Sequence, residues 1–184
     1  MAVSVMAQSS MGVGKWTSAA KHGLGFTWLD PIENKTYTYV QFTKGSGVDG
    51  FEGSPCGIDA ATAADGTLKV TCDQSASVNL QVVGVIRNVT GSAVTDTYYG
   101  WMQIAVPFQV LNSVICSSGV AYGERMVWSA DAVCDGGPAF TSVIEKLFTP
   151  VGIVLSGCAD SGNAFVSTAG TADVLVLLHP CEIS

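Results

Sequence analysis

The chain has 184 residues, which is enough for one large hydrophobic core or two small ones. Hydrophobic residues make up 48% of it and charged residues only 12%, about half of the usual charged share of roughly 25%. The net charge of −7 and the scattered Lys and Arg residues argue against a nucleic-acid-binding surface. So few charges predict an exterior of small, neutral and apolar residues, as in a subunit docked in an assembly or in a secreted β protein.

The apolar runs have the length of strands and fall short of the roughly 18 residues that a membrane span requires. The N-terminus has neither a basic segment nor a continuous apolar segment, so it does not predict a signal peptide. We therefore expect synthesis in a cytoplasm and no membrane partner.

Residues 1–20 are rich in Ser, Gly, Ala and Met and cannot form a core of their own. Two interpretations stay open, a loose terminus or an arm that adds a strand to the sheet edge of a neighbouring subunit. The low surface charge favours the arm. Its predicted contact residues are Met1, Val3, Val5, Met6, Met11 and Trp16.

Residues 21–184 predict an all-β domain, because β-branched and aromatic residues cluster in short runs between turn residues. We expect either one compact barrel-like or sandwich-like unit or two packed β subdomains divided near residue 107. The segment 139–148 predicts one short helix, since its apolar residues have helical spacing. The predicted strands are 36–43, 67–72, 78–86, 98–106, 108–116, 120–128, 151–155 and 173–178.

Two of these strands are alike in sequence. "VVGVI" at 82–86 and "PVGIVL" at 150–155 share a valine-glycine pair inside an apolar run. The similarity indicates either a weak internal duplication or a composition that strands often have.

The strand at 98–106 separates its residues between two faces, because side chains alternate along a strand. Gly100 lies on the wholly apolar face, where its missing side chain would let a ring or backbone approach closely. Tyr99, Trp101 and Gln103 share the other, amphipathic face. That face predicts packing against protein or, as the alternative, a sugar-binding platform. Packing is favoured because Gln103 is its only flanking amide.

The sequence contains no recognisable catalytic motif. His179 and Cys181 are separated by a proline near the C-terminus without a nucleophile motif, and His22 is expected to be a solvated loop residue. The six cysteines have wide, irregular spacings without a zinc pattern, so the default prediction is buried free thiols. Disulfides that form after release from a cell are the alternative. We predict no catalytic residue, no metal site and no cofactor.

Three segments resemble the head-decoration, or capsid cement, proteins of tailed bacteriophages, notably those infecting cyanobacteria. They are an opening hairpin "LGFTWLDPIENKTYTYVQFTKGSG", the central "YYGWMQIAVPFQVLNSVICSSGVAYGERMVWSADAVC" and a closing pair "PVGIVLSGCADSGNAFVSTAGTADVLVLLHP". The first motif of the central segment is aromatic-Gly-Trp-x-Gln, here Tyr99 to Gln103. Together they cover roughly residues 24–180, by pattern rather than by dense identity.

This resemblance implies a non-enzymatic virion protein on the outer surface of an icosahedral head. Its implied partner is the major capsid protein, whose lattice it would stabilise, and a homo-oligomer, commonly a trimer, is implied as well. The alternative function is a carbohydrate-binding or adhesive β module that uses Tyr99, Trp101 and Gln103.

Overall fold

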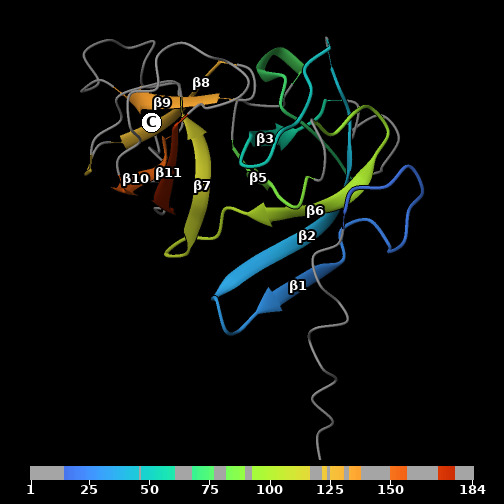
Figure 1. Ribbon diagram of the computed structural model, residues 1–184, viewed down its shortest axis with the longest axis horizontal. Helices are drawn as coiled ribbons and strands as arrows, with labels where there is room; N and C mark the ends of the chain where they lie inside the picture. The colour runs from blue at the N-terminus through green and yellow to red at the C-terminus, as the bar shows by residue number, and fades with distance from the viewer. Residues whose placement is uncertain are drawn as a thin grey trace, which may run out of the picture.

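The structure is a computed structural model that describes residues 15–45, 47–60, 68–76, 82–89, 93–116, 122–123, 125–130, 133–137, 150–156 and 170–176. In these ranges the chain forms eleven β-strands and one short 3₁₀ turn at Gln74–Ala76 (Figure 1). The predicted all-β class is confirmed. The helix predicted at 139–148 lies outside the described residues.

The first six strands form one sheet whose pairings close a ring, which we call the N-terminal barrel. The ring runs β2-β4-β3-β5-β6 and returns to β2, while β1 pairs only with β2. Five of its neighbour pairs are antiparallel, and only β2 and β4 are parallel. The strands are β1 (Thr27–Asp30), β2 (Lys35–Phe42), β3 (Pro55–Ile58), β4 (Lys69–Thr71), β5 (Gly84–Ile86) and β6 (Tyr99–Ile104).

The last five strands form a closed barrel, the C-terminal barrel, in the order β10-β11-β7-β9-β8. Here too a single pair is parallel, β7 with β9. The segment between β6 and β7 links the two barrels. The strands are β7 (Val110–Cys116), β8 (Arg125–Ala130), β9 (Val133–Gly137), β10 (Pro150–Ser156) and β11 (Gly170–Val176).

The two barrels have the same topology. We number the five ring strands of each barrel one to five in chain order. In both barrels the order of hydrogen-bonded neighbours around the ring is one, three, two, four, five and back to one. In both, the parallel pair joins strands one and three. The two similar sequence runs, in β5 and β10, are the fourth strands of their barrels.

The register agrees as well, because one residue correspondence satisfies all five pairings of the ring. Gly84 pairs with Cys56 and Ile104 just as Gly152 pairs with Met126 and Val176. The remaining matched pairs are Phe42–Val70 with Cys116–Cys134, Ile58–Val70 with Trp128–Cys134, and Val40–Gly100 with Val114–Ala172. Because the two barrels share both topology and register, the chain contains an internal structural repeat.

The barrels differ at a bulge in β7. Its register against β11 shifts between Ala172 and Val174, and Ser113 has a positive φ of 45°. The Ser113 backbone N–H donates to Asp173 Oδ1 at 2.8 Å, so the extra residue keeps a hydrogen-bond partner.

Each barrel fills its own interior. The N-terminal core contains Trp16, Val40, Phe42, Cys56 and Met102. The C-terminal core contains leucine, valine, methionine and cysteine side chains around the fully buried Trp128.

The two barrels pack directly on one another. Val85, which points out of the N-terminal barrel, is fully buried among the core residues of the C-terminal barrel. Gln103 Nε2 donates to the Val110 carbonyl at 2.8 Å, and Gln74 Nε2 donates to the Trp128 carbonyl at 2.7 Å. The strand pair β5–β6 therefore forms part of the interface with the C-terminal barrel, which buries it.

Candidate functional site

The outer face of β1, β2 and β6 carries an aromatic wall, formed by Trp28, Tyr37, Tyr39 and Trp101. The β2–β6 register places Tyr39 opposite Trp101, and their rings meet edge to face with centroids 5.3 Å apart. Trp28 and Tyr37 are opposite each other in β1 and β2 and stack at 5.5 Å. The wall follows from period-two alternation, which sends every second side chain of these strands to this face.

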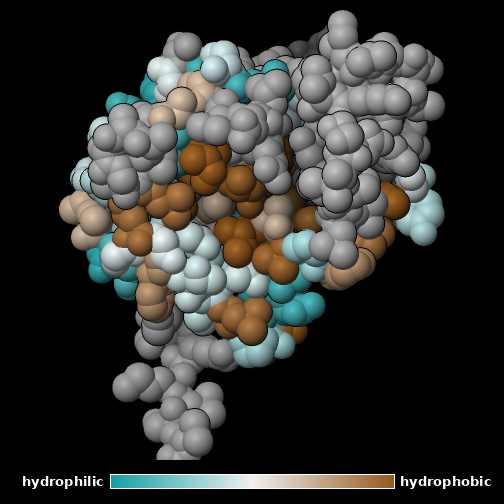
Figure 2. All heavy atoms as spheres, turned by 180° about the vertical axis from the view of Figure 1, so that it is seen from behind, coloured by the Kyte–Doolittle hydropathy of each residue, from teal (hydrophilic) through white to brown (hydrophobic). Residues whose placement is uncertain are grey.

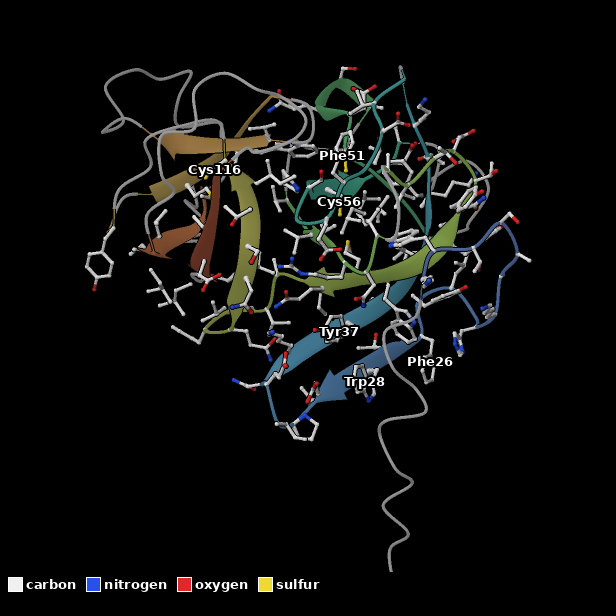
Figure 3. The ribbon with its side chains drawn as sticks, in the orientation of Figure 1. Phe26, Trp28, Tyr37, Phe51, Cys56 and Cys116 are labelled. Atoms are coloured by element: carbon white, nitrogen blue, oxygen red, sulfur yellow. The ribbon has the colours of Figure 1, made fainter. Side chains whose placement is uncertain are left out.

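The loop before β1 covers part of this wall. The His22 ring lies 5.5 Å from the Trp101 ring and stacks on Phe26 at 6.0 Å. The Lys21 backbone N–H donates to the Tyr39 hydroxyl at 3.0 Å, which ties the loop down. His22 is exposed, as expected, but it is not merely solvated, because it packs on aromatic rings. Phe26 is 46% exposed and forms the outer rim of the wall (Figure 3).

The hairpin of β1 and β2 presents two apolar side chains to solvent, Leu29 from β1 and Ile32 from the turn. Asp30 Oδ1 accepts the backbone N–H groups of Ile32 at 2.9 Å and Glu33 at 3.2 Å, and Asn34 takes a left-handed φ of 52°. Asp and Asn are residues that favour turns, and here they fix the turn. Leu29 is 52% exposed and Ile32 84% exposed. We call these two residues the hairpin tip.

Two different parts of the chain shield the central motif, Tyr99 to Gln103, from solvent. Trp101 is only 3% exposed beneath the loop, and Gln103 is 1% exposed beneath the C-terminal barrel. Tyr99 is half-buried, and its backbone exchanges hydrogen bonds of 2.8 and 2.9 Å with Thr17. Other parts of the chain therefore cover Trp101 and Gln103. The sugar platform expected as the alternative is not an exposed surface.

Gly100 has the role that the sequence predicts. The Trp16 ring lies directly over it, so that a Cβ atom at position 100 would approach ring carbons closer than 3.0 Å. Trp16 Nε1 donates to the Arg87 carbonyl at 2.7 Å, and the indole meets Phe42 edge to face at 6.3 Å. The structure thus places Trp16 in the core, not on a free surface.

The chain joins the N-terminal barrel within the predicted arm of residues 1–20. The chain is attached to the N-terminal barrel from Trp16 onward, through the Thr17–Tyr99 bridge. Met1, Val3, Val5, Met6 and Met11 lie outside the described residues, and their contact role stays a prediction.

One buried charge lies where the barrels meet. Arg87 Nε donates to Gln103 Oε1 at 3.1 Å, and Arg87 Nη1 lies 3.4 Å from Glu52 Oε1. Burial lowers the pKa of Arg87, and the nearby Glu52 carboxylate opposes that shift. Burial also raises the pKa of Tyr37, with the Glu33 carboxylate adding to the effect. Arg87 thus anchors the polar part of the junction, which Gln103 extends to β7.

The thiols agree only in part with the prediction of free cysteines. Cys56, Cys72 and Cys134 are buried, and burial raises the pKa of the Cys56 thiol, which makes it a poor nucleophile. Cys116 is instead disulfide-bonded, and the prediction of a free thiol is wrong there. Wide spacing in the sequence could not reveal a pair brought together by the fold.

Over the described ranges, no group of three or more His, Cys, Asp and Glu side chains could hold a metal ion. No helix in those same ranges has the length and apolar character to cross a bilayer. His179 and Cys181 lie outside them.

The arrangement is suited to docking. The β1–β2 hairpin presents two exposed aliphatic side chains, Leu29 from β1 and Ile32 from the fixed turn. Leu29, Ile32 and Phe26 are not among the site residues predicted from the sequence. An apolar residue inside an otherwise polar turn was the signal that could have identified Ile32.

No protein-family model matches the chain, and no curated protein matches it. One solved structure, the head fiber gp8.5 N base of bacteriophage phi29, is similar with a TM-score of 0.48 and 9% sequence identity. The alignment covers 79% of this chain and 99% of that one.

Proposed function

We propose that this protein is a non-enzymatic structural protein that docks on the outer surface of a phage head, where it binds and stabilises the major-capsid lattice. The observation that carries the proposal is the hairpin tip, where Leu29 at the end of β1 and Ile32 in a fixed turn are both exposed. A preformed apolar projection loses little conformational entropy on binding, which favours docking in a shallow pocket.

Two further features support the proposal. The hairpin, the central aromatic motif and the closing strands are the segments whose pattern resembles capsid cement proteins. The low charge content leaves apolar residues gathered on the surface, as the back of the molecule shows (Figure 2). On a repeating lattice, weak contacts of this kind act together and reach high avidity.

Attachment by an N-terminal arm belongs to the same proposal. Because Trp16 belongs to the barrel core, the proposed arm comprises only residues before Lys15. Removing residues 1–14 tests the arm while Trp16 stays in place, whereas removing Trp16 as well would also destabilise the barrel.

The test is co-sedimentation with expanded, DNA-free heads of the encoding phage, with polysaccharide beads as the comparison surface. Leu29→Asp with Ile32→Asp should weaken head binding at least about tenfold, and deletion of residues 1–14 should weaken it as well. Tyr122→Asp is the matched control, since Tyr122 is 76% exposed but lies on the C-terminal barrel.

Unchanged head binding by the double variant would reject the hairpin tip, and unchanged binding by the deletion would reject the arm. If the wild-type protein pelleted with beads and not with heads, the lattice-binding function itself would be wrong.

A further inference from the structure

Phe108 has an unusual combination of backbone conformation and exposure. It lies in the connection between β6 and β7 (Figure 1), with a left-handed φ of 64° and a side chain that is 66% exposed. Among the residues that the structure describes, it alone is a large apolar residue with both a left-handed φ and an exposed side chain. The other non-glycine residues with a positive φ there are Asn34, Asn88, Thr97 and Ser113.

A tight turn imposes this conformation. The Gln109 backbone N–H donates to the Val106 carbonyl at 3.0 Å, so Pro107 and Phe108 occupy the two central positions of a four-residue turn. A proline followed by a left-handed residue is the arrangement of a type II turn, whose second central position favours glycine or asparagine. The backbone therefore disfavours a phenylalanine at this position.

Hydrogen bonds on both sides hold the turn in place. The Phe108 backbone N–H donates to the Val176 carbonyl at 2.9 Å, and the Val176 N–H donates to the Gln109 carbonyl at 3.0 Å. The Gln109 side chain also accepts a hydrogen bond of 3.2 Å from the Thr36 hydroxyl. These bonds tie the turn to β11 and to β2, so the backbone at Phe108 cannot relax on its own.

The free protein gains little from the Phe108 ring. Two thirds of the side chain is exposed, so most of the ring contributes no apolar burial. The chain thus holds a phenylalanine in a conformation that its backbone and its hydration both disfavour. Strained backbone that the surrounding structure enforces is concentrated at functional sites, where the strain serves binding.

The turn lies next to the hairpin tip. Thr36, whose hydroxyl bonds to Gln109, is the register partner of Leu29. Side chains directly opposite each other on paired strands lie on the same face, so Leu29 and Thr36 share one face of the hairpin. Phe108 therefore adjoins one end of the Thr36–Gln109 bond, and Leu29 adjoins the other.

We propose that Phe108 belongs to the same docking surface as the hairpin tip and that its ring inserts, beside Leu29, into an apolar depression of the phage-head surface. This inference rests on the proposed function and specifies the chemistry of the partner, which must be apolar across both side chains. Insertion would bury a ring that the free protein leaves exposed. The fixed turn leaves little conformational entropy to lose, and aromatic anchors of this kind dominate binding energy at interfaces.

The experiment compares Phe108→Asn with the wild type by co-sedimentation with expanded, DNA-free heads and by denaturant unfolding. Asparagine tolerates the left-handed conformation, so the denaturation midpoint should equal or exceed that of the wild type while the affinity for heads falls at least about tenfold. Phe108→Tyr keeps the ring and should bind heads within about twofold of the wild type. Tyr122→Asn, which removes another exposed ring, is the matched control and should bind like the wild type.

The outcomes separate this inference from the proposed function. If the wild type binds heads and Phe108→Asn binds them equally well, the inference is wrong and the proposed function stands. A lower denaturation midpoint for Phe108→Asn would show that the ring stabilises the fold, and it would also overturn the inference. A wild type that does not pellet with heads would reject the proposed function and this inference with it.

Sedimentation velocity without heads tests a second copy of the chain as the partner of the ring. Phe108→Asn should sediment like the wild type at every concentration. Self-association of the wild type that Phe108→Asn abolishes would contradict insertion into the head surface.

Discussion

The two barrels share one hydrogen-bonding framework but fill it differently. In the N-terminal barrel a tryptophan from outside the ring, Trp16, lies over Gly100, whereas Ala172 stands at the matching position of the C-terminal barrel. The large ring of the C-terminal barrel comes instead from its own second strand, as Trp128.

Comparing the two barrels distinguishes positions that the hydrogen-bonding framework fixes from positions where different side chains can fill the core. The glycine in the fourth strand is common to both barrels, because a Cβ atom there would overlap the carbonyl of the facing fifth strand. The source of the large core side chain differs, so packing is adjustable as long as the volume is filled. The similar sequence runs of β5 and β10 both contain this glycine, Gly84 in one and Gly152 in the other.

The largest expected effect is at Trp16. Trp16→Ala should lower the free energy of unfolding by about 3–5 kcal/mol, because it leaves a cavity and removes the bond to the Arg87 carbonyl. Gly100→Ala should destabilise the wild type but be neutral or stabilising alongside Trp16→Ala, since the ring is then gone. Denaturant unfolding of the four proteins measures this coupling, and additive effects would contradict the close approach.

The two framework glycines should show equal, intermediate effects. Gly84→Ala and Gly152→Ala should each cost about 1–3 kcal/mol or more, because the new methyl group meets backbone atoms that cannot move aside. Gly23→Ala is the control, since an added Cβ there meets no atom within 4 Å. Thermal and denaturant unfolding would refute the equivalence of the barrels if only one of the two substitutions were costly.

The smallest effect is expected at the junction. Gln103→Leu installs the residue that the C-terminal barrel has at the matching position, and it should cost about 1–2 kcal/mol because Arg87 Nε and the Val110 carbonyl lose their partner. Gln41→Leu, on the half-buried outer side of β2, should change stability by less than about 0.5 kcal/mol. Equal denaturation midpoints for Gln103→Leu and the wild type would show that this hydrogen-bond chain does not hold the barrels together.

The sequence predicted much of the strand content. Runs of β-branched residues identified β2, β6, β7, β10 and β11, because such residues favour extended backbone and alternate between two faces. β3 and β9 were missed, since Pro55, Gly57, Asp135 and two glycines give them low strand propensity. Ring closure supplies their partners, and pairing between distant strands is not encoded in any local window.

The faces of β6 were predicted correctly, but the site was only partly found. Alternation placed Gly100 inside and Trp101 outside, whereas it could not say that a loop covers Trp101 and a second barrel covers Gln103. Trp16 was assigned to an arm because its neighbours are small and polar, and local composition does not reveal a core that accepts a single distant ring.

The closure of each ring by its first and last strands has a consequence for biosynthesis. β2 cannot complete its pairing until β6 has left the ribosome, so the N-terminal barrel closes only after about a hundred residues have been made. Until β7 follows, Val85 on the outside of that barrel has no cover. The nascent chain therefore passes through a stage with an uncovered apolar strand pair, and the slow, non-local pairing of the second ring determines how long that stage lasts.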